Sequence, residues 1–131
     1  MARDSVLAAT IAPWLEVNDG NRAVAFFRAA FGAEERYRLI DDAGSVAVAR
    51  LSIGGAEFWV QEDSDAGTAA EASGRPIRLI LTVNDSDALF RQALAAGATE
   101  IAPVSEEHGW RVGRLADPFG HHWEVGTPLD N

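Results

Sequence analysis

The sequence contains one internal repeat, and this repeat limits the folds that the chain can adopt. Four short landmarks occur twice, in the same order and 64 to 66 residues apart. They are Val17-Asn18-Asp19 with Val83-Asn84-Asp85, Gly32-Ala33 with Gly97-Ala98, Arg50-Leu51 with Arg114-Leu115, and Gly55 with Gly120. Two copies are too few for a repeat array, so we expect a duplicated module.

Each copy has the pattern of one strand, one helix and three further strands. Asp19 and Asp85 are placed to cap the helices, apolar residues follow at helical spacing, and Gly32 and Gly97 stand where helices end. Runs of β-branched and aliphatic residues, separated by turn residues, predict the strands. The expected strands are 10–17, 34–40, 45–52 and 56–62 in the first copy, and 77–83, 98–103, 110–116 and 121–127 in the second.

This order predicts an α+β fold made of two tandem βαβββ modules. The chain has 131 residues, 47% of them hydrophobic, which suits one domain with a real core. We expect a single domain over 1–131, with module one at about 8–62, a linker at 63–76 and module two at about 77–127. Pro13 cannot donate a hydrogen bond, so the first strand should be an edge strand.

Strand alternation divides the expected sheet into two different faces. Trp14 shares a face with Glu16, and His122 shares one with Glu124, whereas Trp123 points the other way into the core. The set Ile77, Leu79, Leu81 and Val83 is purely apolar and should pack on a helix. The opposite face mixes tryptophan with polar residues. Such a face indicates a small-molecule pocket, or alternatively a solvated surface.

Composition narrows the classes of partner. The net charge of −9 repels nucleic acid and anionic membranes, and either favours a cationic ligand or serves solubility alone. The absence of cysteine excludes disulfides and thiolate sites. No signal-peptide pattern and no long apolar run are present, so we expect a cytoplasmic protein.

Several segments resemble the glyoxalase/bleomycin-resistance/extradiol dioxygenase superfamily, which has the vicinal oxygen chelate fold. They are Pro13-Trp14-Leu15-Glu16-Val17-Asn18-Asp19, Ala25-Phe26-Phe27, Phe31-Gly32-Ala33-Glu34, Ala88-Leu89-Phe90, Ala96-Gly97-Ala98 and Asp117-Pro118-Phe119-Gly120-His121-His122-Trp123-Glu124. The resemblance covers about 10–127. It implies a mixed sheet curled around a cavity with helices outside, and a homodimer, because many members are dimers whose chains share the cavity.

Enzymes of this superfamily hold a divalent metal with side chains from the first and last strands of each module. By the resemblance, those positions are Ala12, Trp59, Arg78 and Glu124. Only Glu124 can bind a metal, and one carboxylate is too few. A register error of one residue would add Glu57 or Gln61 and still not complete a site. We therefore expect no metal and no other cofactor.

The remaining candidates suit a ligand site without metal. Arg78 and Glu124 can form an ion pair in place of the metal or contact a ligand. Trp14 and Trp59 can stack on a flat or cationic ligand or serve packing. The candidate ligand-binding residues are Trp14, Trp59, Arg78, Thr82, Trp110, His122 and Glu124.

The resemblance and these residues predict a binding protein of the bleomycin-resistance type. It would sequester a cationic or aromatic, antibiotic-like small molecule in an aromatic-walled cavity. One alternative is a lyase, isomerase or dioxygenase, either metal-dependent or using Glu124 or His122 as general base. Another is an accessory module for protein contacts.

Overall fold

The computed structural model describes residues 10–66 and 77–129. Its elements follow the predicted order of two βαβββ modules. They are β1 (Trp14–Val17), α1 (Gly20–Phe31), β2 (Glu34–Ile40), β3 (Val46–Ile53), β4 (Ala56–Glu62), β5 (Arg78–Thr82), α2 (Ser86–Ala96), β6 (Thr99–Glu107), β7 (Trp110–Ala116) and β8 (His122–Pro128). Residues 8–9 of the expected first module and 67–76 of the expected linker lie outside the described residues.

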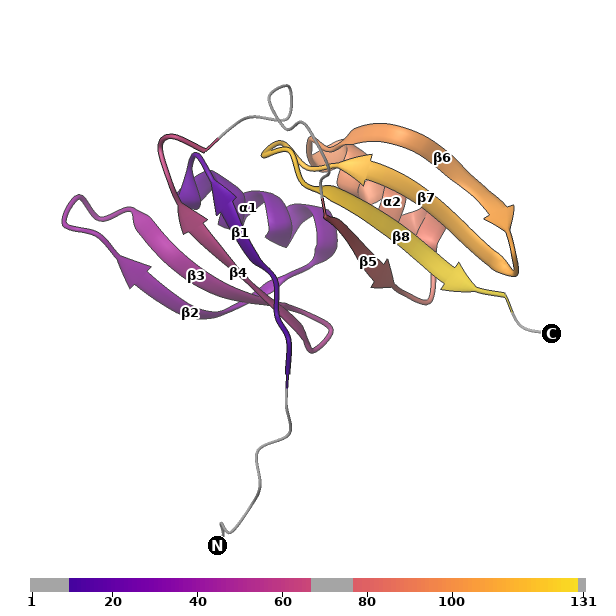
Figure 1. Cartoon of the computed structure of the whole chain (residues 1–131), viewed down its shortest axis with the longest axis horizontal. Coiled ribbons are helices and arrows are strands. Elements are labelled where there is room, and N and C mark those ends of the chain that lie inside the picture. Colours follow the sequence, from indigo (N-terminus) through magenta and orange to yellow (C-terminus); the bar gives the residue numbers. More distant parts are fainter. Residues whose placement is uncertain (1–9, 67–76, 130–131) are drawn as a thin grey trace, which may run out of the picture.

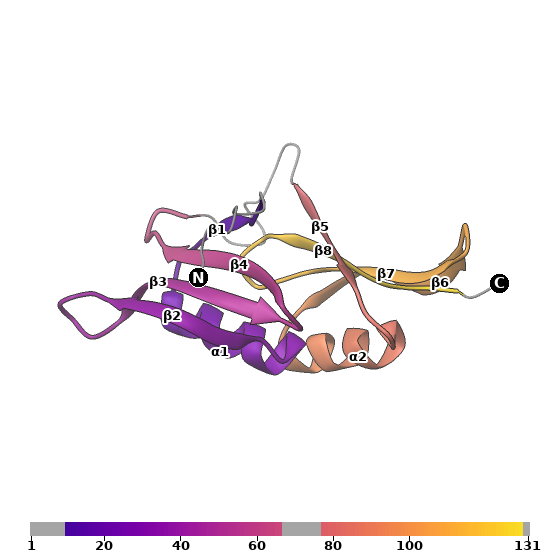
Figure 2. The same cartoon turned by 90° about the horizontal axis from the view of Figure 1, so that it is seen from below.

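The strands form two four-stranded sheets, one from each module, in the orders β1-β4-β3-β2 and β5-β8-β7-β6. In each sheet the first strand is parallel to the last strand of its module, and the other pairs are antiparallel. The sheets lie side by side (Figure 1). Both helices lie next to each other on one side of the sheets (Figure 2). The predicted α+β class and tandem modules are confirmed, and the opposite face of each sheet is left open.

Two strand boundaries differ from the prediction by more than one residue, for reasons of backbone chemistry. β1 begins at Trp14 rather than at residue 10, because Pro13 has no amide proton and contributes only its carbonyl, which accepts from the Trp59 amide (2.9 Å). β1 is an edge strand, as Pro13 predicted. β6 continues to Glu107 rather than ending at 103, because the ladder is irregular between Ala102 and Ser105 and so accommodates Pro103.

Both helices begin and end at the predicted residues. Asp19 Oδ1 accepts from the Arg22 amide and Asp85 Oδ1 accepts from the Ala88 amide, each at 3.0 Å. Gly32 adopts the left-handed conformation, with φ of 69°, that closes α1. Among the described residues, neither helix is long and apolar enough to cross a membrane.

Aromatic side chains join the two modules in one core. Phe27 of α1 is fully buried, with its ring centroid 5.1 Å from that of Phe58 and 5.6 Å from that of Trp123. Trp123 donates its indole proton to the buried carboxylate of Asp117 (2.9 Å), which also accepts from the amide of Phe119. Trp123 is therefore a core residue, as its strand position predicted, and the turn before β8 is fixed against α1.

Candidate functional site

The open faces of the sheets carry the side chains that alternation predicted. In β1, Leu15 is buried while Trp14 is 50% exposed. In β8, Trp123 is buried while Glu124 is partly exposed. The prediction for Ile77 is wrong: its side chain is 81% exposed, because β5 begins only at Arg78 and Ile77 lies before the paired strand.

Four side chains lie in a line across the open face of the first sheet, and we call them the aromatic row. The strand register aligns Trp14 with Trp59, Trp59 with Arg50, and Arg50 with Tyr37. The rings of Trp14 and Trp59 are stacked, with centroids 5.8 Å apart and an interplanar angle of 26°. The Tyr37 ring meets Trp59 edge-on at 6.1 Å. The register of adjacent strands therefore produces a continuous aromatic surface.

Polar neighbours hold the aromatic row in place. The indole nitrogen of Trp14 donates to Gln61 Oε1 at 3.0 Å. The Arg50 guanidinium lies 5.5 Å from the Trp59 ring centroid, and its Nε is 3.9 Å from Glu57 Oε1. Trp14 and Tyr37 nevertheless remain about half exposed (50% and 46%). The row is thus ordered before any ligand arrives, which lowers the entropy cost of binding.

The equivalent line on the second sheet is different, and we call it the polar row. Glu124 is in register with Ile80 on one side and Arg114 on the other, and Arg114 is in register with Ala102. Glu124 takes the place of Trp59 and Arg114 that of Arg50. Arg78 lies two residues before Ile80 on β5, with its Nη1 4.0 Å from Glu124 Oε2. The ion pair that the sequence suggested is therefore present, at long separation.

Two hollows flank Glu124, and both are lined by the second module alone. One has a volume of about 270 Å³ and is lined by Ile80, Glu107, His108, Trp110, Val112, Glu124 and Gly126. The other has a volume of about 330 Å³ and is lined by Arg78, Ala102, Pro103, Ser105, Glu107, Val112, Gly113, Arg114 and Glu124. The Glu124 side chain thus separates a hollow with a tryptophan wall from one with two arginines.

The structure divides the predicted site residues between the two sheets. Trp14 and Trp59 lie together on the first sheet. The other five belong to the second: Trp110 and Glu124 line one hollow, Arg78 and Glu124 line the other, His122 is in register with Arg78, and Thr82 is exposed on β5 opposite Gly126.

Sequence reasoning missed four residues of these faces. Tyr37 and Arg50 complete the aromatic row, and Glu107 and Arg114 line the hollows beside Glu124. The repeated Arg-Leu pair was a usable signal for the two arginines, because each Arg-Leu dipeptide sits at the same place in its module. Tyr37 and Glu107 carried no comparable signal, since strand register alone brings them to the site.

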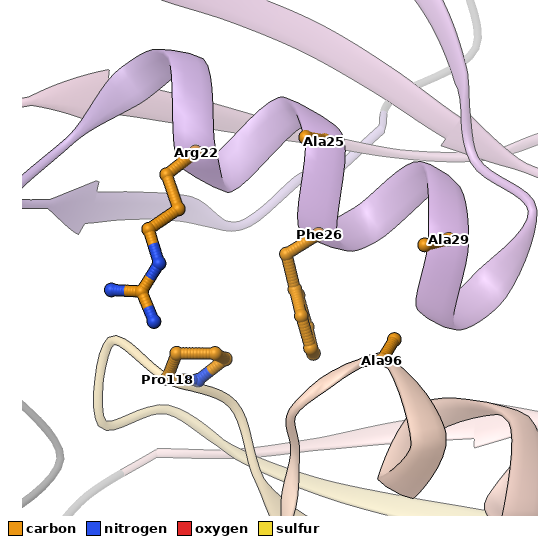
Figure 3. Close-up of a pocket in the computed structure, with 6 residues that line it drawn as sticks. All are labelled: Arg22, Ala25, Phe26, Ala29, Ala96 and Pro118. Atoms are coloured by element: carbon orange, nitrogen blue, oxygen red, sulfur yellow. The ribbon is translucent and has the colours of Figure 1, made fainter.

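A third hollow lies on the helix side, where the modules meet (Figure 3). It has a volume of about 230 Å³ and is lined by Arg22, Ala25, Phe26, Ala29, Ala96 and Pro118. In Figure 3, Arg22 and Phe26 extend from α1 toward the loop that carries Pro118. The Arg22 guanidinium lies 5.6 Å from the Phe119 ring centroid, so it already has an aromatic partner. The small side chains of Ala25 and Ala29 leave the rest of the space open.

Residues 13–126 match the glyoxalase-like domain family, which includes both modules. The chain belongs to this family. A protein of Mycobacterium bovis, Mb0911c, is 36% identical over 126 residues, which cover 91% of this chain and 83% of that protein. The Mycobacterium tuberculosis protein Rv0887c is also 36% identical, over 91% of this chain and 74% of its own length.

Several solved structures share the fold of this chain. TioX from Micromonospora sp. ML1 superposes with a TM-score of 0.75 at 28% identity, covering 93% of this chain and all of TioX. The fosfomycin resistance protein FosX from Listeria monocytogenes gives a TM-score of 0.70 at 20% identity, covering 95% of this chain and 96% of FosX. The glyoxalase-like domain match over 13–126 places the chain in the vicinal oxygen chelate superfamily, as its motifs predicted.

The metal that serves the enzymes of this superfamily does not fit the side chains of this glyoxalase-like chain. Trp59 stacks on Trp14, and the cationic Arg78 lies beside Glu124, the one carboxylate among the four family positions. Within 10–66 and 77–129, no group of three or more His, Cys, Asp or Glu side chains is placed to hold a metal. A divalent ion needs three or four such donors, so these side chains do not form a site for it.

Proposed function

We propose that this chain binds a small organic ligand with a planar aromatic group, and that the aromatic row receives it without a metal. The observation that carries the proposal is the stacked pair of Trp14, which is half exposed, and Trp59, which is partly exposed, with Tyr37 and Arg50 beside it. Antibiotic-like compounds with planar ring systems fall within this class.

The physical basis is the cost of leaving ordered aromatic rings in water. Trp14 is held by stacking and by the hydrogen bond to Gln61, yet half of its surface contacts solvent. A planar ligand would bury this surface and add aromatic contacts worth about 0.5–1.5 kcal/mol each beyond area burial. Because the side chains are already ordered, most of that energy would appear as affinity.

Substitution of Trp59 tests the proposal. Binding of quinoline, benzimidazole and coumarin to the wild-type protein would be followed by nuclear magnetic resonance. Trp59→Ala should weaken the binding of each compound that binds the wild type by roughly tenfold. It removes the central ring of the aromatic row and with it about 1.4 kcal/mol of binding free energy. Trp59→Phe keeps a ring and should retain most of the affinity. Equal affinity of Trp59→Ala and wild type, or no binding of any of the three, contradicts the proposal.

We also propose that a second copy of the chain covers the open faces, giving the homodimer that the family resemblance implies. Large apolar side chains are exposed on both sheets and extend beyond the reach of one small ligand. They include Trp14, Tyr37, Leu39 and Ile40 on the first sheet and Ile80, Ile101 and Trp110 on the second, each at least 38% exposed.

Light scattering after size-exclusion chromatography tests the dimer. We expect a mass of twice the 14.0 kDa of the monomer. Leu39→Glu should shift the mass toward the monomer, because it places a charge on a side chain that is 50% exposed in the isolated chain and buried by the partner. At a protein concentration of about 100 µM even weak dimers form. A wild-type protein that is still a monomer at this concentration contradicts the proposed dimer.

A further inference from the structure

The hollow beside Trp110 combines an apolar wall with two carboxylates, and we call it the Trp110 hollow. Trp110 and Ile80 are both exposed and line it together with Val112, while Glu107, Glu124 and His108 supply its polar groups. Gly126 forms part of the lining, and an added Cβ there would approach the Trp110 ring to 3.3 Å. The missing side chain at Gly126 thus lets the Trp110 ring lie close to β8.

The two carboxylates are only weakly compensated. Glu107 Oε2 accepts a hydrogen bond from Ser105 Oγ (3.3 Å), and no ion pair to Glu107 occurs in the described part of the chain. Glu124 faces Arg78 at 4.0 Å, and the Arg78 side chain is half exposed, so water screens this pair. The lining of the Trp110 hollow includes no Lys or Arg, and the whole chain carries a net charge of −9. Both the local and the overall field therefore favour a cation.

The neighbouring hollow shows why the cation should enter on the Trp110 side. It shares Glu107 and Glu124 with the Trp110 hollow, but its lining also contains Arg78 and Arg114. Those guanidinium groups lie on that side of the two carboxylates and repel a second cation there. The polar row thus separates a region that attracts positive charge from one that does not.

We propose that the Trp110 hollow binds the protonated amine of an organic ligand. Glu107 and Glu124 face the ammonium group, and Trp110 and Ile80 contact the apolar part next to it. A volume of about 270 Å³ lies just below the range of ordinary ligand pockets, so it accommodates one amine-bearing arm rather than a whole large molecule. The inference rests on the proposed function, because it assigns the charge of a ligand of that class.

Three probes of similar shape test the charge preference directly. They are 2-phenylethylammonium, 2-phenylethanol and 3-phenylpropionate, which differ in charge at pH 8. Binding would be followed by the indole signal of Trp110 at low salt. We expect the ammonium probe to bind about tenfold more tightly than the alcohol and the carboxylate to bind more weakly than either, with the preference reduced at high salt.

Variants that each remove one carboxylate charge show which side chains cause the preference for the ammonium probe. Glu107→Gln and Glu124→Gln should each reduce the ammonium preference by about threefold to tenfold while leaving the alcohol nearly unaffected. Glu106→Gln is the matched control: Glu106 neighbours Glu107 on β6, but its carboxylate lies 3.9 Å from Arg111, which bonds Asp87 on the helix side. This control should leave the preference unchanged. Because Glu107 is exposed in a hairpin, its variant should fold even if Glu124→Gln does not.

The outcomes separate the two proposals. Equal affinity for the ammonium probe and the alcohol, or a preference that survives both carboxylate variants, overturns the amine site. Either result leaves the proposed function intact if quinoline, benzimidazole or coumarin, which we call the planar panel, still binds at Trp59. If none of the three planar compounds binds at Trp59, the proposed function is overturned, whichever probes bind in the Trp110 hollow.

Discussion

The two sheets use the same backbone plan to present different chemistry. Across the first sheet the order is Trp14, Trp59, Arg50 and Tyr37, and the equivalent positions of the second hold Ile80, Glu124, Arg114 and Ala102. Only the arginine is common to both rows. Pairing of the strands depends on the backbone and on the buried face, so the open face of each copy is free to change.

The helix sides of the modules differ as well. α1 contributes buried phenylalanines, including Phe27, to the junction, while α2 contributes the small Ala93 at a corresponding buried place. At the helix starts, buried Gly20 corresponds to buried Ser86. The two helices therefore bury different side chains at equivalent positions, although the modules share one backbone plan.

The largest expected effect is at the junction. Phe27→Ala should lower the free energy of unfolding by about 3–5 kcal/mol, because the fully buried ring contacts Phe58 of its own module and Trp123 of the other. Urea denaturation followed by circular dichroism measures the change. Ile11→Ala, at a site that is 99% exposed, is the control and should cost about 0.5 kcal/mol or less. Similar losses in both variants would contradict the junction's role.

The helix starts should respond unequally to alanine. At Gly20 a Cβ would lie 2.1 Å from the carbonyl oxygen of Val46, so Gly20→Ala should cost about 2–3 kcal/mol through forced displacement. Ser86→Ala removes only the hydrogen bond from Ser86 Oγ to the carbonyl of Arg111 (3.0 Å) and should cost about 1 kcal/mol. Thermal unfolding of the two variants checks the order. The reverse order would show that the modules do not pack their helices as described.

Replacing the central residue of the aromatic row by that of the polar row tests whether the difference between the rows decides which ligand binds. Trp59→Glu gives the first sheet the central residue of the second and should weaken binding of the planar panel about tenfold or more, because stacking is lost and a carboxylate is placed beside Arg50. Calorimetry or line-shape analysis would measure the affinity. Arg114→Gln is a control on the other row. If it weakened planar binding as much as Trp59→Glu, the aromatic row would not be the site.

The smallest expected effect is a pH dependence confined to the second module. Hydrogen bonds from Arg111 (2.7 and 2.9 Å) lower the pKa of Asp87, whereas the corresponding residue in the first module is Asn21, which accepts from the Val46 amide and does not titrate in this range. Because the pKa of Asp87 is lower in the folded state, its pair with Arg111 stabilises the protein at pH values above the unfolded-state pKa, which is about 4. This stabilisation is lost as the pH falls through the folded-state pKa.

The test compares Asp87→Asn with wild type at two pH values. At pH 7 the variant should be slightly less stable than wild type, and the effect is small because the Asp87–Arg111 pair is exposed. Near pH 3 the difference in stability between the two proteins should shrink. Chemical denaturation at each pH measures it. A difference that grows on acidification would contradict the assigned sign.

The repeat and its motifs predicted the architecture well, for physical reasons. Asp19, Gly32 and the phenylalanines of α1 act through local hydrogen bonds and helical spacing, which sequence alone displays. Strand alternation placed Trp14 and Trp123 on the correct faces. The errors came at Pro13 and Ile77, where pairing with a distant strand decides where β1 and β5 begin.

The candidate site was less predictable because it depends on registers between strands. Trp59 was expected from the repeat, but its contacts with Tyr37 and Arg50 follow from pairings across β2, β3 and β4. Glu107 lies in a strand that extends past its predicted end. Local patterns thus identified the faces, and long-range register determined which side chains meet on them.

The four tryptophans provide the most direct test of the central claim that the aromatic row binds a planar ligand. Each indole N–H gives its own signal in a nitrogen–proton correlation spectrum, and Trp123 is a buried reporter at 4% exposure. On titration with the planar panel, the signals of Trp14 and Trp59 should move with one common affinity while that of Trp123 stays fixed. Saturable binding that leaves both Trp14 and Trp59 unmoved, or no saturable binding at all, would contradict the account.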